Sequence, residues 1–210
     1  DNADANCELT IENSAFAGCI NLEEIKLSEN VRRIGEMTFY NCNSLKQIKL
    51  PLKLKSLGSR VFGGTGITSI TIPKTLESAY SYNKGALAGA RNLKEVIIED
   101  GMTKIPPDLV CVDEDNQIQK VQIPSSVKEI GGSAFRNCAC LTEMSFGKGL
   151  EKIGSSAFYG CKGLKKINFT DNADVNCELT IENSAFAGCI NLEEVKLSEN
   201  IKGIGAGAFS

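Results

Sequence analysis

The sequence contains no histidine and no tryptophan among its 210 residues, and only five prolines. Without histidine, Ser-His-Asp and Cys-His catalysis are excluded, and so is every His-ligated metal site. The commonest general base near neutral pH is also missing. No paired constellation of carboxylates or cysteines stands out in its place. We therefore expect a protein that is not an enzyme and that holds neither a cofactor nor a metal ion.

Long hydrophobic runs and a strong net charge are also missing. No stretch of about 18 apolar residues is present, so no transmembrane helix or membrane insertion is expected. No basic start followed by an apolar stretch marks a signal peptide. The net charge of −3 provides no basic surface for nucleic acid. The chain opens on Asp1 rather than Met, which suggests a processed protein or a fragment.

The dominant positive feature is an internal repeat. The segment 34–42 reads IGEMTFYNC, and it returns as IGGSAFRNC at 130–138 and as IGSSAFYGC at 153–161. The spacing of its aromatic column is 23 residues in most copies, and small insertions account for the rest. That column is formed by Phe16, Phe39, Phe62, Leu87, Val110, Phe135, Phe158, Phe186 and Phe209.

A second pattern, L-x-x-I-x-L, lies between these motifs. Its copies include 22–27, 45–50, 93–98, 141–146, 164–169 and 192–197. The alternating part predicts a short strand with one buried face. One coil of 23 residues cannot bury that face alone, whereas stacked coils share a continuous core. A period in the twenties with this pattern indicates leucine-rich repeats.

Glycine and proline recur at fixed places within the repeat. Gly35, Gly58, Gly131, Gly154 and Gly205 share one column, where we expect a tight turn or a positive φ. Pro51, Pro73 and Pro124 share another, just after the predicted strand, where proline ends the pairing at little cost.

A longer duplication is superimposed on the short repeat. Residues 1–30 and 171–200 match at 28 of 30 positions and differ only at Ala5/Val175 and Ile25/Val195. The pattern predicts one repeat domain over 1–210, irregular at 75–117, which is a piece of a longer array. Solenoids normally need polar caps, and none is visible, so contact between chains through uncapped ends is also expected.

These motifs resemble the BspA-type, or Treponema pallidum-type, leucine-rich repeat. Residues 118–138 carry the resemblance through Ile118, Val121, Ile123, Pro124, Val127, Ile130, Gly131, Ala134, Phe135 and Cys138. The resemblance implies an α/β-type repeat solenoid. It would be a right-handed superhelix of about 8–9 coils, with short parallel strands on its concave face and an irregular or short-helical convex side.

The nine cysteines allow disulfides, metal binding or buried thiols. Cys19, Cys42, Cys138, Cys161 and Cys189 stand three residues after the aromatic position, and Thr65 and Ala90 occupy the same column. A column that accepts Cys, Thr and Ala favours a small, mostly buried side chain. Four cysteines lie outside it, and whether they form disulfides stays open: Cys7, Cys111, Cys140 and Cys177. Of these, Cys140 is expected to be exposed.

Two polar columns beside the buried strand positions are the predicted ligand-facing surface. Their side chains are of mixed charge and include no aromatic group, so a strong hydrophobic anchor is not expected. A solvated sheet face is the alternative. The candidate residues on this surface are Glu24, Lys26, Gln47, Lys49, Glu95, Ile97, Lys120, Glu143, Lys166, Glu194 and Lys196.

Two insertions in the irregular middle are further candidates. The first insertion contains Tyr80 and Tyr82, which could form a contact patch for a partner. The second is an acidic loop at 113–116. Insertions in solenoids map to loops on one face and often bind. The acidic loop and the Asp/Asn-rich segments 1–6 and 171–176 also leave calcium open.

Members of the family that the chain resembles are mostly secreted or attached to the cell surface, and several are implicated in adhesion. The resemblance therefore implies a non-enzymatic scaffold that binds a matrix or host-cell protein, at the cell surface or after secretion. The alternative is a structural spacer or filament segment without a dedicated ligand. The near-identical blocks motivate that alternative, because selection for a ligand usually diversifies one surface.

Overall fold

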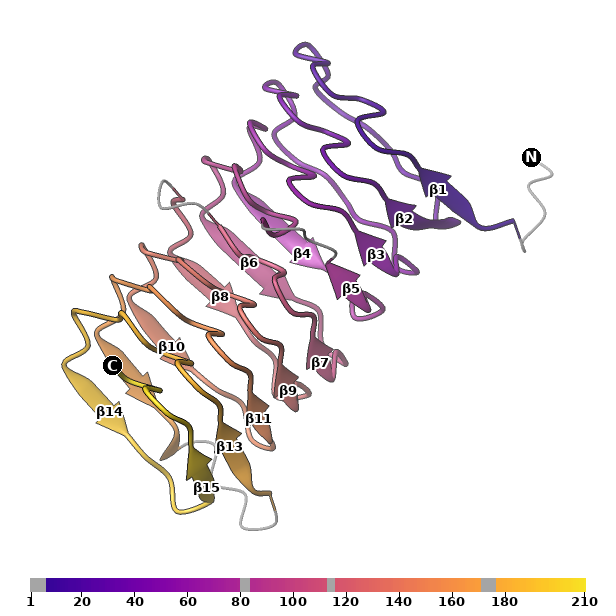
Figure 1. Ribbon diagram of the computed structural model, residues 1–210. Helices are drawn as coiled ribbons and strands as arrows, with labels where there is room; N and C mark the ends of the chain where they lie inside the picture. Colours follow the sequence, from indigo (N-terminus) through magenta and orange to yellow (C-terminus); the bar gives the residue numbers. More distant parts are fainter. Residues whose placement is uncertain (1–6, 80–83, 113–115, 171–176) are drawn as a thin grey trace.

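The computed structural model describes residues 7–79, 84–112, 116–170 and 177–210. The chain winds into a solenoid whose coils stack side by side along one axis (Figure 1). Strands are short and pair in parallel with the strands of neighbouring coils. They form two rows along the solenoid, which we call the front row and the rear row, and the front row has no strand in the first two coils.

The front row contains most of the strands predicted from the L-x-x-I-x-L pattern, but the predicted copies at 22–27 and 45–50 form no strand. It consists of two three-stranded sheets, in the orders β4-β6-β8 and β10-β12-β14. Residue pairing is regular: Ile70 is opposite Val96, and Met144 is opposite Ile167. The strands are β4 (Ser69–Ile72), β6 (Glu95–Ile98), β8 (Lys120–Gln122), β10 (Glu143–Ser145), β12 (Lys166–Asn168) and β14 (Glu194–Lys196).

The rear row replaces the irregular or short-helical side that the resemblance implied. No α-helix is present in the described ranges. The sheets there have the orders β1-β2-β3-β5 and β15-β13-β11-β9-β7. Their strands are β1 (Leu9–Ile11), β2 (Val31–Ile34), β3 (Ser56–Leu57), β5 (Ser78–Ala79), β7 (Lys104–Ile105), β9 (Glu129–Ile130), β11 (Lys152–Ile153), β13 (Leu179–Ile181) and β15 (Ile201–Ile204).

The rear strands form because the residue before the glycine column is apolar and faces the core. Ile34, Ile130 and Ile153 occupy this place and are completely buried. The residues before them are polar and at least partly exposed, as at Lys152. This alternation covers only two to four residues, which is too short to stand out as a strand in the sequence. Pairing with the same segment of the next coil makes it one.

The aromatic column forms the centre of the core, as predicted. The rings of Phe135 and Phe158 are stacked with centroids 5.2 Å apart, and those of Phe158 and Phe186 are 5.0 Å apart. Leu87 and Val110 replace phenylalanine in the irregular coils and are also buried. The ends of the ladder, Phe16 and Phe209, are only half-buried.

The glycine column is explained by close packing between coils, and the alternative of a positive φ is wrong there. None of its five members has a positive φ. A Cβ added to Gly58 would lie 2.4 Å from the backbone nitrogen of Glu36, and one added to Gly154 would lie 2.6 Å from that of Gly132. Any side chain at these positions would overlap the backbone of the preceding coil.

Most of the positive φ values occur in two other columns that the sequence did not reveal, and Gly101 and Gly149 lie outside them. Two residues before the aromatic position, Met37, Ser133 and Ser156 have φ values of 54°, 54° and 57°. Two residues after it, Asn41 and Gly160 have φ values of 59° and 71°. These left-handed residues reverse the chain on either side of the buried ring.

The cysteine column is buried where a coil precedes it. Cys42, Cys138, Cys161 and Cys189 are buried, whereas Cys19 in the first coil is exposed. All nine cysteines are free thiols. The expectation that Cys140 is exposed is wrong. Cys140 is partly buried because its thiol donates to the carbonyl oxygen of Asn116, 3.3 Å away.

The proline column has the predicted place after the front strands. The carbonyl oxygens of Pro51, Pro73 and Pro124 each accept a hydrogen bond from the backbone nitrogen three residues later, at 3.0–3.2 Å. Proline therefore opens the turn that leads from the front row to the rear row. Within the described residues, no helix is long and apolar enough to cross a membrane.

Candidate binding face

The front row brings most of the predicted ligand-facing residues into aligned columns. Glu95 on β6 lies opposite Lys120 on β8. Further along, Lys166 on β12 lies between Glu143 on β10 and Glu194 on β14. Side chains of alternating charge therefore follow one another from coil to coil. The two sheets are not paired with each other, since β8 and β10 belong to different sheets.

Glu95 accepts hydrogen bonds from two other side chains of these columns. Lys120 Nζ lies 2.9 Å from Glu95 Oε1, and Gln122 Nε2 donates to the same oxygen at 2.6 Å. These two hydrogen bonds, that from Lys120 above all, lower the pKa of the Glu95 carboxyl. Ile97 lies beside them and is half-buried. The exposed position of the Lys120 side chain limits the free energy that this ion pair contributes.

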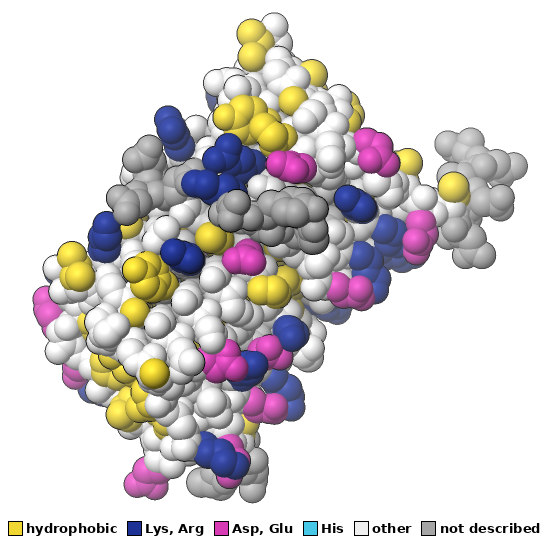
Figure 2. Space-filling view, viewed as in Figure 1, with side chains coloured by type: hydrophobic (Ala, Val, Ile, Leu, Met, Phe, Trp, Pro, Cys, Tyr) yellow, Lys and Arg dark blue, Asp and Glu magenta, His cyan; other side chains and the backbone are white. Residues whose placement is uncertain are grey.

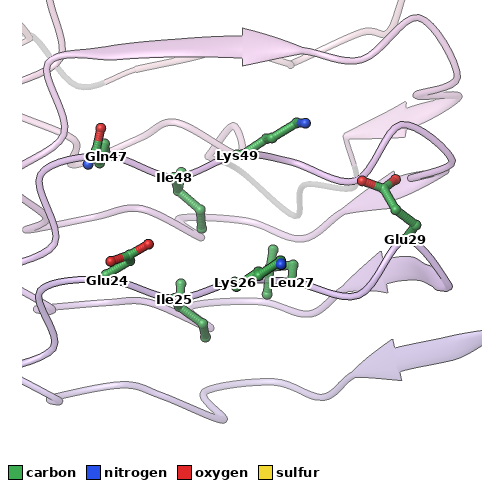
Figure 3. A pocket seen from close by; sticks show the side chains of 8 residues that line it. All are labelled: Glu24, Ile25, Lys26, Leu27, Glu29, Gln47, Ile48 and Lys49. Carbon is green, nitrogen blue, oxygen red and sulfur yellow. The ribbon is translucent and has the colours of Figure 1, made fainter. Parts of the chain in front are cut away.

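The first two coils of the front row form a hollow rather than a sheet. Residues 22–27 and 45–50 run side by side, but neither segment is a strand. Between them lies a hollow of about 420 Å³ (Figure 3). Four of the predicted residues contribute to its lining, together with Ile25, Leu27, Glu29 and Ile48. They are Glu24, Lys26, Gln47 and Lys49.

Apolar and charged side chains both line the hollow. Ile25 and Ile48 point to one side of their segments, and Gln47 and Lys49 point to the other (Figure 3). The two isoleucines are half-buried, whereas Ile167 at the equivalent place in β12 is 1% exposed. Neither Lys26 nor Lys49 has an ion-pair partner among the described side chains. The sequence indicated a polar surface of mixed charge with Ile97 as its one apolar candidate, and it missed the apolar lining from Ile25, Leu27 and Ile48.

The hollow exists because the first coils are not joined by backbone hydrogen bonds on this side. In the described ranges, no such bond links 22–27 to 45–50 or 45–50 to 67–72. The rear strands of the same coils are paired, from β1 through β3 to β5. The duplicated segment that contains Val195 does form a front strand, β14. Neighbouring coils, rather than the segment's own sequence, therefore decide whether it pairs.

The rear row carries charges that neutralise one another. Lys152 Nζ lies 2.8 Å from Glu182 Oε1 and 4.0 Å from Glu129 Oε1, and Lys104 Nζ lies 3.1 Å from Glu129. The hydrogen bond that Lys152 donates to Glu182 raises the pKa of Lys152 and, above all other causes, lowers the pKa of Glu182. Figure 2 shows both signs interspersed on the surface.

The two predicted loop sites fall mostly outside the residues that the structure describes. Tyr80, Tyr82 and 113–115 lie outside the described residues, as do the Asp/Asn-rich segments 1–6 and 171–176. Asn116 at the edge of the acidic loop is buried, and its side-chain amide donates to the carbonyl oxygen of Asn137 at 2.6 Å. Among the residues that are described, no group of three His, Cys, Asp or Glu is arranged to hold a metal ion.

Comparison with known proteins identifies the repeat class. The family model described as "BspA type Leucine rich repeat region (6 copies)" matches residues 9–111 and 111–210. Together these matches cover nearly the whole chain. The chain therefore belongs to the BspA-type leucine-rich repeat family, which confirms the resemblance seen in the sequence. A search of curated proteins finds no significant match.

Three solved structures are similar to this chain. The pneumococcal vaccine antigen PcpA is 25% identical with a TM-score of 0.51, and the match covers 93% of this chain and 50% of that one. A leucine-rich repeat protein from Bacteroides ovatus is 26% identical with a TM-score of 0.43, covering 96% and 67%. A leucine-rich cell surface protein from Faecalibacterium prausnitzii is 19% identical with a TM-score of 0.40, covering 89% and 69%.

Proposed function

We propose that this chain is a non-enzymatic scaffold that binds a protein partner, at the cell surface or after secretion. Membership of the BspA-type family supports a repeat scaffold, and the likeness to a pneumococcal vaccine antigen supports an exposed location. The observation that carries the proposal is the hollow between 24–29 and 47–49, where half-buried isoleucines meet a rim of unpaired lysines.

The composition of this hollow suits a protein side chain better than a small metabolite. A protein interface combines an apolar centre with a polar rim. Ile25 and Ile48 provide the centre, and Lys26 and Lys49 provide cationic groups that an acidic partner would approach. The aligned charges along β6, β8, β10, β12 and β14 extend the same face, so a long partner can add many weak contacts.

The experiment is a binding assay with the whole 210-residue chain against immobilised extracellular-matrix proteins and host cells. Ile48→Glu places a charge in the hollow, and Lys26→Glu/Lys49→Glu reverses its rim. Each change should weaken saturable binding at least about tenfold, as loss of an interface anchor does. Lys104→Glu on the rear row is the matched control and should leave binding unchanged.

The alternative, a structural spacer, predicts a different outcome. A spacer gives no saturable binding to any of these surfaces, and the front-row variants then behave like the wild-type chain. Its support is the duplicated block, in which 28 of 30 positions are the same. Binding that survives all the front-row changes would place the partner elsewhere on the chain and overturn the proposed face.

A further inference from the structure

A second hollow lies on the rear row, whereas the proposed protein-binding face lies on the front row. Its volume is about 470 Å³, and it lies over β2, β3 and β5. Polar side chains and one glycine line it, with no apolar side chain. The polar ones are Asn13, Arg33, Glu36, Ser56, Ser59 and Ser78.

The regular pairing of the rear strands brings the key groups together. Arg33 on β2 is opposite Ser56 on β3, which is opposite Ser78 on β5. Ser78 Oγ donates to Ser56 Oγ at 3.1 Å, which leaves the hydroxyl hydrogen of Ser56 available to a ligand. One guanidinium and two hydroxyls from three successive coils therefore share one column.

The Arg33 guanidinium is exposed and has no ion-pair partner among the described residues. Its neighbour Arg32 is engaged. Arg32 Nη1 donates to the carbonyl oxygen of Glu29 at 2.8 Å, and Arg32 Nε lies 3.8 Å from Glu8 Oε1. A guanidinium presents planar donors that match a carboxylate through two parallel hydrogen bonds. Arg33 is thus the group in this hollow that is fitted to an anion.

The carboxylate of Glu36 makes a ligand that carries hydroxyl groups a better fit than a simple anion. A carboxylate beside Arg33 disfavours a bare anion but accepts hydrogen bonds from hydroxyl groups. The side-chain oxygen of Asn13 accepts the backbone N–H of Glu36 at 2.8 Å, which fixes the Asn13 amide and leaves its nitrogen as a further donor. The hollow therefore offers a cation for a carboxylate, together with both donors and acceptors for hydroxyls.

We infer that this rear hollow binds a sugar that carries a carboxylate, such as a uronic or sialic acid residue of a glycan. The carboxylate would lie against Arg33, and the ring hydroxyls would bond to Glu36, Ser56 and Asn13. The absence of apolar lining argues against a peptide, whose recognition depends on buried apolar anchors. A sugar has a hydroxyl for each of these polar groups.

The duplicated block provides an internal comparison. Asn183 repeats Asn13, and its side-chain oxygen accepts the backbone N–H of Ala206 at 2.9 Å, as Asn13 does for Glu36. The local scaffold is therefore the same in both copies. However, Gly203 and Ala206 stand where the first copy has Arg33 and Glu36. The hollow beside Asn183 and Gly203 has no guanidinium in its lining.

The test is an NMR titration of the ¹⁵N-labelled 210-residue chain with methyl glucuronide, the methyl glycoside of sialic acid, neutral methyl glucoside and acetate. We expect saturable shift changes at Arg33, Ser56 and Ser78 with an acidic sugar at concentrations up to about 10 mM. Either acidic sugar supports the inference, and the stronger of the two identifies the source of the carboxylate. No change with both, or equal binding of the neutral sugar or acetate, would overturn it.

Two variants locate the site. Arg33→Gly gives position 33 the residue found at its equivalent, Gly203. Glu36→Ala gives position 36 the residue found at its equivalent, Ala206. Each should weaken acidic-sugar binding about tenfold or more, the effect of losing a charge-assisted hydrogen bond. Lys202→Ala in the second copy is the control and should bind like the wild-type chain. An unchanged far-ultraviolet circular dichroism spectrum shows that each variant is folded, and undiminished binding by folded Arg33→Gly would overturn the assignment.

Discussion

The thiol of Cys161 donates a hydrogen bond to the carbonyl oxygen of Phe135 in the preceding coil, over 3.3 Å. Cys42 bonds to Phe16 at 3.0 Å and Cys189 bonds to Phe158 at 3.4 Å in the same way. The cysteine column thus combines a small buried side chain with a weak donor between coils. Thr65 satisfies the same requirement within its own coil, since its hydroxyl donates to Phe62 at 2.7 Å.

This arrangement predicts which cysteines react with a thiol reagent. The exposed Cys7 and Cys19 should be alkylated first in the native chain, because only an accessible thiolate attacks. The buried Cys42, Cys138 and Cys161 should react only after unfolding. Mass spectrometry of peptides after timed alkylation measures the order. Early labelling of Cys161 would contradict its burial in the ladder.

Alkaline pH should destabilise the fold through the buried thiols. Burial above all raises the pKa of Cys189 to about 12, from an ordinary value of 9.0. Above pH 9 the unfolded thiol ionises while the folded one keeps its proton, so stability falls as pH rises from 9 to about 12. The slope for this group approaches about 1.4 kcal/mol per pH unit.

Urea unfolding at several pH values measures this slope. Cys189→Ala should remove its share of the pH dependence, whereas Cys7→Ala at an exposed position should not. The comparison is between slopes, so a lower overall stability of Cys189→Ala does not affect it. Equal slopes for the wild-type chain and Cys189→Ala would show that this thiol does not contribute.

Removal of a ring from the middle of the aromatic ladder should cost more than removal from its end. Phe158 is completely buried and is stacked on Phe135 and Phe186. Phe158→Ala should lower the free energy of unfolding by about 3–5 kcal/mol, the usual cost of deleting a buried ring. Phe209→Ala removes a half-buried ring and should cost clearly less. Chemical denaturation compares the two, and equal losses would argue against a continuous core.

The glycine column can be tested with a matched pair of substitutions. Gly58→Ala would bring a Cβ to 2.4 Å from the backbone of Glu36, so the coils must separate. We expect a loss of about 1–3 kcal/mol, as for overpacking of a core. Gly203 has nothing within 4 Å of an added Cβ. Gly203→Ala should therefore leave the denaturation midpoint nearly unchanged, and a similar loss in both variants would refute the close-packing explanation.

Much of the solenoid was predictable because its repeat is local. The 23-residue spacing, the L-x-x-I-x-L strands and the aromatic column each depend on residues close together in the chain. Leu87 and Val110 were assigned to the aromatic column by position alone, and both are buried. The BspA-type family was recognisable from the motif at 118–138 for the same reason.

The errors arose where a residue's environment depends on the next coil. The rear strands hold two to four residues each, and only pairing between coils distinguishes them from turns. Cys140 was expected to be exposed because its column holds polar residues elsewhere, but Asn116 covers it. The glycine column was expected to form a tight turn or to take a positive φ, whereas the structure shows that a Cβ at Gly58 would overlap the backbone of Glu36 in the preceding coil.

By itself, therefore, the sequence determined the class of the protein, its period and the contents of its core. The tertiary structure decided where the hollows lie. The segment around Ile48 and the column of Arg33 and Ser56 owe their form to the spacing and pairing of coils more than 20 residues apart. An alternating pattern specifies which side of a strand is buried. It does not specify whether the neighbouring coil pairs with that strand or leaves a gap beside it.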